Sequence, residues 1–370
     1  MESSLWKGDR HLKRYRDPLF APERRRHPAL IFLVIFLSFV LATLLVFNHI
    51  NNSRVNLSRQ NVTVPNLPSA LERFRILHIS DLHGLSFGAR QERLADTLAG
   101  VSYDIVCITG DITGKDGSID AFLDLVDIFP DDVPVYFIIG DEDPAPIRAV
   151  PHGNASATAY YILEAESHGA IYLDAPQKIT VGKANLWIYP EWVYTLDVDA
   201  SETAYSTRYA QLLEEPESEQ RAAAMTAVEY QQEQLQRIRA ARRETLETDI
   251  HIALTHHPLQ LSALENMQAW TASENDSYVR TISLVLSGHY CGGQWRLPFV
   301  GAVRVPESAG VGNKGWFPGD QKVVGFSTFL GIPQYISPGL GASEAIGLPA
   351  FRLFNTPTVT QITLTSKLTN

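Results

Sequence analysis

The sequence predicts an α/β protein with a parallel sheet at its core, preceded by a single transmembrane helix. Two observations predict this class: an uncharged apolar run near the N-terminus, and after residue 73 a recurring order of short apolar runs, polar loops and helical segments. At 370 residues, of which 45% are hydrophobic, the chain can bury a large core in one or two domains. Only two cysteines occur, Cys107 and Cys291, so a disulfide framework is not expected and a metal-binding thiol is an open option.

The apolar run ALIFLVIFLSFVLATLLVF, residues 29–47, predicts a membrane-spanning helix. At about 1.5 Å per residue it just crosses a hydrocarbon core of roughly 30 Å, and a buried helix of a soluble protein is the less favoured alternative. Residues 1–28 carry eight basic and four acidic side chains, so they are predicted to form a cytoplasmic tail. The following FNHINNSRV lacks a small-residue cleavage pattern, which favours an uncleaved signal anchor over a removed signal peptide. We therefore expect a single-pass cell-membrane protein that is extracytoplasmic from residue 48.

The charge balance of the rest of the chain excludes one class of partner. Residues 29–370 carry 23 basic and 37 acidic side chains, a net charge of −14. Binding to a nucleic-acid backbone needs clustered Lys and Arg, so nucleic acid is not expected as the natural ligand. Residues 48–72 are polar, contain two prolines and predict a stalk, which leaves 73–370 as the main domain.

Five apolar runs of this domain predict buried strands, and each leads into a loop with Asp or His. They are FRILHIS (74–80) before DLHG, DIVCIT (104–109) before GDIT, VPVYFII (133–139) before GDED, DIHIALT (249–255) before HHP, and TISLVLS (281–287) before GHYCGG. Residues 91–100 and 120–129 have helical spacing and separate the first three strands, so we expect a parallel β-α-β-α-β order with all loops at one sheet edge. Residues 201–247 predict a helical insertion that either covers the site or forms a solvated flank.

Potential metal ligands occur at all five strand ends. They are Asp81, His83, Asp111, Asp141, His256, His289 and Cys291, with Glu142 beside them. Oxygen, nitrogen and sulfur donors in such a set can hold one or two divalent cations. Any single member has a plainer explanation, because Asp in a GD turn commonly caps the turn. The recurrence at five strand ends favours the metal site.

In order and spacing these motifs resemble those of the calcineurin-like metallophosphoesterases, particularly a membrane-anchored bacterial branch with D-x-H-G, G-D, G-N-H-[DE], H-x-P and G-H-x-H-G-G-Q. The resemblance runs from about residue 73 to the end and includes the closing YISPGLGASEAIGLPAFRLFNTPTVTQITL (335–364). It implies a four-layer α/β/β/α sandwich with two divalent ions of the Zn, Fe or Mn class. It also implies a phosphate-ester substrate, a phosphomonoester or phosphodiester, hydrolysed by a metal-bound hydroxide. Asp81 and His83 resemble ligands of the first metal, Asp111 the bridging ligand, and His256 and His289 ligands of the second.

Two motifs depart from the family pattern. The chain has Gly140-Asp141-Glu142-Asp143 in place of G-N-H-[DE], and Gly288-His289-Tyr290-Cys291 in place of G-H-x-H. Asp141 can replace Asn as an oxygen donor, and a thiolate at Cys291 favours zinc. Glu142 stands where the family has the histidine that contacts the phosphate and assists the leaving oxygen, so its catalytic role is in question. The sequence therefore predicts a metallophosphoesterase; a metal-binding pseudoenzyme that senses or scaffolds is the alternative, and a metal-free interaction domain comes third.

Overall fold

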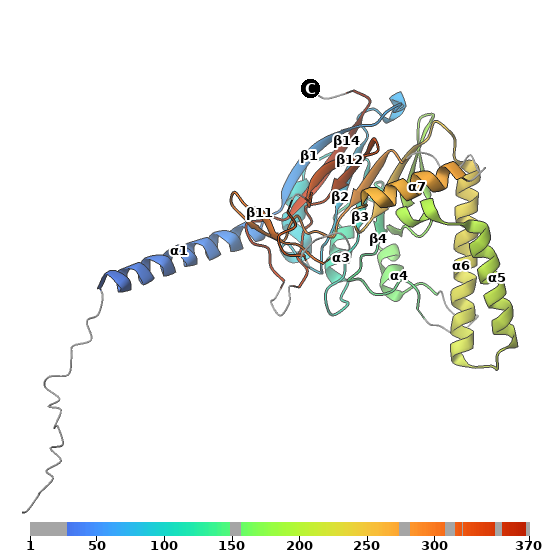
Figure 1. Ribbon diagram of the computed structural model, residues 1–370, viewed down its shortest axis with the longest axis horizontal. Coiled ribbons are helices and arrows are strands. Elements are labelled where there is room, and N and C mark those ends of the chain that lie inside the picture. The colour runs from blue at the N-terminus through green and yellow to red at the C-terminus, as the bar shows by residue number, and fades with distance from the viewer. Residues whose placement is uncertain are drawn as a thin grey trace, which may run out of the picture. The chain divides into compact units, whose positions relative to one another are not determined.

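The computed structural model describes residues 28–148, 157–273, 282–307, 315–319, 321–344 and 350–367, and the chain divides into two compact units, 1–47 and 48–370. The described part of the first unit is the apolar stretch of helix α1 (Pro28–Asn52), which is long and apolar enough to cross a membrane (Figure 1). A signal sequence would have the same length and composition. The predicted cytoplasmic tail lies outside the described residues, except for Pro28.

The second unit is built on two six-stranded sheets that pack face to face. The first has the order β1-β14-β2-β3-β4-β5, and the second the order β12-β13-β9-β8-β7-β6. The strands of the first sheet are β1 (Asn56–Thr63), β14 (Thr358–Thr365), β2 (Arg75–Ile79), β3 (Ile105–Thr109), β4 (Val135–Ile138) and β5 (Ala170–Tyr172). Those of the second are β12 (Gly325–Phe329), β13 (Ile332–Ile336), β9 (Leu284–Ser287), β8 (Ile250–Thr255), β7 (Ala184–Pro190) and β6 (Gln177–Val181). The strands that precede the polar loops, β2, β3 and β4 in the first sheet and β8 and β9 in the second, are parallel to one another within their sheets, as the sequence predicts. β2 is antiparallel to its other neighbour, β14.

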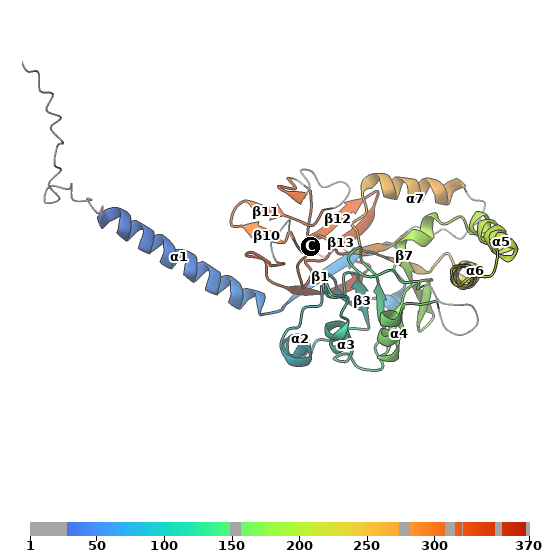
Figure 2. The ribbon, with the colours of Figure 1, turned by 90° about the horizontal axis from the view of Figure 1, so that it is seen from below.

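Helices cover the outer face of each sheet (Figures 1 and 2). Apolar side chains of α2 (Glu92–Leu98), α3 (Asp120–Val126) and α4 (Tyr160–Ser167) pack on the first sheet. Those of α6 (Glu219–Glu244), α7 (Leu261–Ser273) and the 3₁₀ helix η4 (Glu191–Thr195) pack on the second. The remaining short elements are the 3₁₀ helices η2 (Ser69–Leu71) and η3 (Ala89–Gln91) and the two-stranded sheet of β10 (Trp295–Leu297) and β11 (Gly301–Arg304). The predicted four-layer α/β/β/α sandwich is confirmed.

Strand alternation explains why both faces of the sheets are buried. In β2, Leu77 and Ile79 join the helix-side core, whereas Ile76 joins the core between the two sheets. His78 also points between the sheets, where it meets Tyr335 edge-on, and burial lowers its pKa to about 3. Cys107 lies in the same inter-sheet core as a free thiol, which agrees with a packing role.

One segment differs from its expectation. Residues 56–63, expected within the stalk, instead form β1, which pairs in parallel with β14 in the register Asn56↔Thr358. Among the described strands, β1 is the outermost of its sheet and pairs with β14 alone, and most of its side chains are exposed or half-buried. Its sequence, NLSRQNVT, is therefore polar, which is why composition alone indicated a stalk.

The predicted helical insertion forms two helices, α5 (Val198–Glu214) and α6, which pack against each other beside the second sheet. Asp174, which follows β5, accepts two hydrogen bonds of 2.7 Å from the Arg237 guanidinium and one from the Tyr230 hydroxyl, and these contacts fix α6 to the domain. No residue of α5 or α6, both fully described, belongs to the donor clusters described below. Apolar side chains of α6 pack on the second sheet, and the covering of the site by this insertion stays a prediction.

Candidate metal centre

The loops that follow β2, β3, β4, β8 and β9 meet at one edge of the two sheets, and they bring all seven predicted donors together. Asp81, His83 and Cys291 form one group, with donor atoms within 4.8 Å of one another. Asp141, His256 and His289 form a second group, which His257 joins. Asp111 lies within the same distance of Asp81 and His256, and also of His83 and Glu142. It is therefore the carboxylate shared by the two groups.

Close contacts define the second group. His256 Nε2 lies 2.8 Å from Asp141 Oδ1 and 3.2 Å from Asp111 Oδ2, and His289 Nδ1 lies 3.3 Å from Asp141 Oδ1. The Nδ1 of His256 is 2.8 Å from the carbonyl of Thr109. Because a carbonyl only accepts, Nδ1 carries the proton and Nε2 is left to face the carboxylates, which is the usual arrangement of a ligating histidine.

The first group is more deeply enclosed. Asp81 is fully buried, and its carboxylate accepts hydrogen bonds from the Ser80 hydroxyl at 2.6 Å and from the backbone N–H of His289 at 2.8 Å. His83 Nε2 lies 3.6 Å from both Asp111 Oδ2 and the sulfur of Cys291. Burial raises the pKa of Asp81, and it also raises the pKa of the Cys291 thiol, to which the Asp81 charge contributes. Two anionic ligands close together in a buried position are favourable only with compensating positive charge.

The pKa values of the imidazoles also show that positive charge is favoured at this site. Burial by itself lowers the pKa of His256, but hydrogen bonds to Asp111 and Asp141, together with the charges of Asp111 and Asp81, outweigh it and raise this pKa well above its usual value. For His83, contacts with Cys291 and Glu142 outweigh burial in the same way. Protons and divalent cations thus compete for these positions. The two groups of carboxylate, imidazole and thiol donors around one shared carboxylate fit two divalent cations.

The backbone at these residues is held in a strained conformation. Five of the seven donors have φ between 45° and 71°, the left-handed region that non-glycine residues rarely adopt: Asp81, His83, Asp111, His289 and Cys291. Each such residue costs of order 1–3 kcal/mol, and this kind of strain concentrates at functional sites. Close packing enforces it, since a Cβ at Gly140 would lie 2.0 Å from Asp111 Oδ1. Only glycine fits there.

Asp143 supports the site, although the sequence analysis did not assign it a role. Its carboxylate accepts hydrogen bonds from the backbone N–H groups of Ile112 and Thr113, both at 2.9 Å, and of Gly140 at 2.8 Å. It thereby joins the loop that carries Asp111 to the loop that carries Asp141. Its place as the last residue of the GDED motif was the available signal in the sequence.

The C-terminal segment also shapes the centre through residues that sequence reasoning missed. The buried guanidinium of Arg352 donates to the carbonyls of Gly341, Pro338 and Asn355 at 2.6, 2.8 and 2.9 Å. Asn355 in turn donates to the carbonyl of Cys291 at 2.8 Å. This network fixes the glycine-rich turn after β13 against the loop of the first group.

Glu142 does not stand apart from the donors. Its carboxylate lies 3.2 Å from His83 Nδ1 and accepts a hydrogen bond from the Ser343 hydroxyl, while its side chain is 46% exposed. The hydrogen bond from His83, more than any other contact, lowers the pKa of Glu142. Glu142 also falls within 4.8 Å of His83 and Asp111 as a potential oxygen donor. The carboxylate is therefore fixed and ionised at the edge of the first group.

The thiol of Cys291 leads to a prediction about metal preference. When the full chain, purified in maltoside, is loaded from equimolar Zn²⁺ and Mn²⁺, Cys291→His is expected to lower the bound Zn/Mn ratio about tenfold or more, because imidazole is a less zinc-selective ligand than thiolate. Elemental analysis gives the ratio. Cys107→Ala, at the chain's other cysteine, is the control and is expected to leave the ratio unchanged. An unchanged ratio in Cys291→His would mean that the sulfur is not a ligand.

Comparison with known proteins places this centre in a family. Residues 74–292 match the family model described as calcineurin-like phosphoesterase. No curated protein matches the chain significantly. Fourteen chains of solved structures do, among them the phosphopantetheinyl hydrolase PptH from Mycobacterium tuberculosis, with 14% identity over 72% of this chain and 91% of that chain and a TM-score of 0.34. With more than half of its length matched, including all seven donors of the centre, the chain belongs to the calcineurin-like phosphoesterases.

Proposed function

We propose that this protein is a membrane-anchored phosphoesterase that uses two divalent ions to hydrolyse phosphomonoesters or phosphodiesters outside the cytoplasm. The observation that carries the proposal is the position of Asp111 between two groups of donors on strand-end loops. The four-layer fold and the family of the chain support it.

Each group of side chains has a role in this proposal. Asp81, His83, Asp111 and Cys291 would hold the first ion, and Asp111, Asp141, His256 and His289 the second. Two such ions would neutralise the charge of a bound phosphate and lower the pKa of an attacking water. Thr109 orients the imidazole of His256, and Asp143 fixes the two loops that carry Asp111 and Asp141. Because these contacts exist before any substrate arrives, the donors need little rearrangement.

A metal-binding pseudoenzyme is the second candidate, and one observation favours it. Glu142 occupies the position of the family's catalytic histidine, and its contacts with His83 and Ser343 hold it there as an anion. The two candidates differ in turnover: an enzyme hydrolyses bis(p-nitrophenyl) phosphate when the full chain is loaded with zinc or manganese, and a pseudoenzyme binds the ions without hydrolysis. A metal-loaded chain that hydrolyses no ester would favour the pseudoenzyme.

The anchor and its orientation yield a separate prediction. Protease added outside intact cells is expected to digest residues 48–370 while an epitope tag at the N-terminus is protected, because the basic residues before α1 favour a cytoplasmic tail. Immunoblotting for the tag and for the domain measures both parts, and permeabilised cells serve as the control for accessibility. A domain that is protected in intact cells would contradict the proposed topology.

A further inference from the structure

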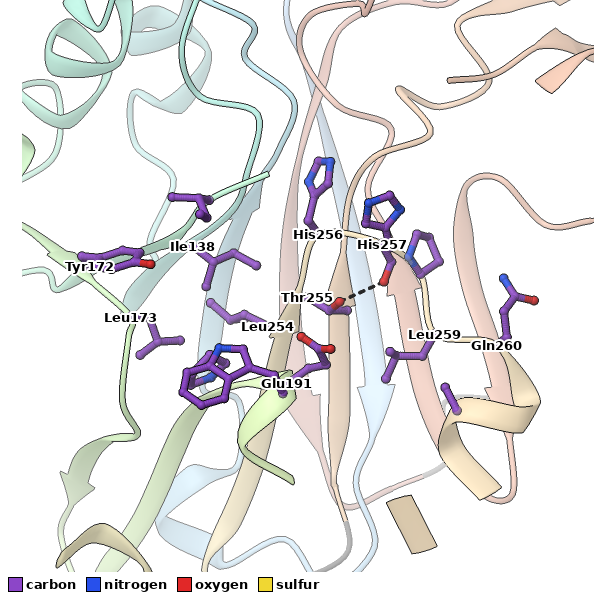
Figure 3. A pocket seen from close by; sticks show the side chains of 15 residues that line it. Ile138, Tyr172, Leu173, Glu191, Leu254, Thr255, His256, His257, Leu259 and Gln260 are labelled. Carbon is purple, nitrogen blue, oxygen red and sulfur yellow. Dashed lines mark hydrogen bonds between the residues drawn. The ribbon is translucent and has the colours of Figure 1, made fainter. Parts of the chain in front are cut away.

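A cavity of about 490 Å³ opens beside the second group of donors (Figure 3). Its rim carries His256 and His257, whose rings extend away from Glu191 in this view. Its walls are mainly apolar and include Ile138, Leu173, Leu254 and Leu259. Cavities of roughly 300–1,000 Å³ with apolar walls and a few polar groups are typical small-molecule sites. A phosphate held at the donors could therefore extend its organic group into this space.

The lining of the cavity contains one carboxylate, Glu191, and no lysine or arginine. Glu191 lines the cavity together with Leu254, Thr255 and Leu259 (Figure 3), and the backbone N–H of Trp192 donates a hydrogen bond to its carboxylate. All fifteen lining residues are described, and none of them is a lysine or arginine. Burial raises the pKa of Glu191, as expected for an acid in apolar surroundings without a cationic partner. A cationic ligand would remove this penalty.

The lining of the cavity also includes two aromatic residues. Tyr172 and Trp192 both line the cavity, and Trp192 is 37% exposed. Ammonium groups bind the faces of aromatic rings, more strongly when they are desolvated, and a nearby carboxylate adds to this attraction. The excess of acidic residues in the chain after the tail also favours cations over anions here.

We propose that this cavity binds an alkylammonium group of the substrate, an inference that rests on the proposed phosphoesterase function. The substrate is then zwitterionic: its phosphate lies at the two donor groups, and its ammonium lies at Glu191, in the cavity that Tyr172 and Trp192 also line. The cavity joins these two places, because its lining includes both the donor His256 and the carboxylate of Glu191. Phosphate esters of amino alcohols have this chemistry, whether they are soluble or are lipid headgroups.

The test compares two esters that differ only in charge. The full chain, purified in maltoside and loaded with zinc, is assayed with p-nitrophenyl phosphocholine and with p-nitrophenyl 3,3-dimethylbutyl phosphate, in which carbon replaces nitrogen. We expect kcat/KM to be about tenfold or more higher for the choline ester, and the ratio to fall to about one in Glu191→Gln. Glu217→Gln, the same change at an exposed carboxylate between α5 and α6, is expected to keep the wild-type ratio. Equal kcat/KM values for the two esters in the wild type would overturn the assignment.

A binding measurement separates this inference from the proposed hydrolysis. Calorimetric titration with phosphocholine and with 3,3-dimethylbutyl phosphate reports the ammonium preference without turnover. If no ester is hydrolysed but phosphocholine binds more tightly, and Glu191→Gln removes the difference, the cavity assignment stands and the hydrolase proposal fails. If neither assay distinguishes the charged from the neutral probe, the cavity assignment is wrong.

The source of the ammonium group is tested in a third assay. Glycerophosphocholine represents the soluble esters, and short-chain phosphatidylcholine represents the lipids. Each is compared with its glycerol counterpart, which lacks the ammonium group. A preference for either choline compound supports the proposal and identifies the source. Equal hydrolysis of the choline and glycerol compounds in both pairs contradicts it.

Discussion

Asp111→Asn is expected to lower the bound metal of the full chain to about one ion or fewer. It is also expected to lower kcat/KM for bis(p-nitrophenyl) phosphate by roughly 10³-fold or more, because metal ions stabilise the transition state by several kcal/mol and each 1.36 kcal/mol corresponds to a factor of ten in rate. Asp111 is the carboxylate shared by both donor groups, and only 2% of it is exposed. Asparagine keeps its shape and can still accept the N–H of Glu142, which lies 3.0 Å from Asp111 Oδ1. The substitution therefore removes charge with little change in packing.

Elemental analysis and steady-state kinetics measure the two effects on the same preparation. The control is Asp116→Asn, which makes the same change at an exposed residue on the same loop and is expected to leave metal content and turnover unchanged. Wild-type metal content in Asp111→Asn would contradict the assignment of Asp111 as the shared ligand. Loss of metal with retained hydrolysis would show that hydrolysis takes place at another site.

The parallel strands and their loops were predictable because each depends on a short, continuous stretch of sequence. A buried parallel strand is apolar throughout, and the loop after it begins at the sheet edge, so the sequence around Asp81, Asp111 and His256 indicated both the fold and the gathering of donors. β1 was missed for the opposite reason. An edge strand needs few apolar residues, and its partner β14 lies about three hundred positions later in the chain, with Asn56 opposite Thr358.

The supporting contacts of the centre could not be predicted because they join distant segments. Ser343 is 201 positions from Glu142, and Asn48 donates to the carbonyl of Arg352 across 304 positions. The guanidinium of Arg352 donates hydrogen bonds to backbone carbonyls, and a sequence motif does not reveal such contacts. The sequence also presented Glu142 as an isolated departure from the family motif. The structure shows that Glu142 contacts His83 and Ser343, so a substitution of Glu142 also changes these two contacts.

Glu142→His is expected to raise kcat/KM for alkyl phosphodiesters by about 10²–10⁴-fold, the usual range for general acid catalysis, and to change aryl esters much less. In the wild type a carboxylate held ionised by His83 cannot protonate a leaving oxygen, and it repels the phosphate. Turnover should therefore depend steeply on the acidity of the leaving group, with aryl esters cleaved and simple alkyl esters barely affected. An imidazole at this position removes the repulsion and supplies a proton. Because the Glu142 side chain is 46% exposed, the new ring can be accommodated without loss of fold.

A second substitution at the same residue separates the two causes. Glu142→Gln removes the charge without adding a proton donor, so it is expected to raise kcat/KM for aryl and alkyl esters by a similar factor and to leave the leaving-group dependence steep. Glu142→His is expected to flatten that dependence, and the pair Glu142→His with Cys291→His tests whether the thiol limits the gain. The measurement is kcat/KM for a series of phosphodiesters of graded leaving-group acidity, at equal metal content. If the wild type cleaves alkyl esters as well as Glu142→His does, Glu142 does not limit the hydrolysis of alkyl esters. If the metal-loaded variants all lack turnover, the chain is a pseudoenzyme, and residues other than Glu142 and Cys291 account for its lack of activity.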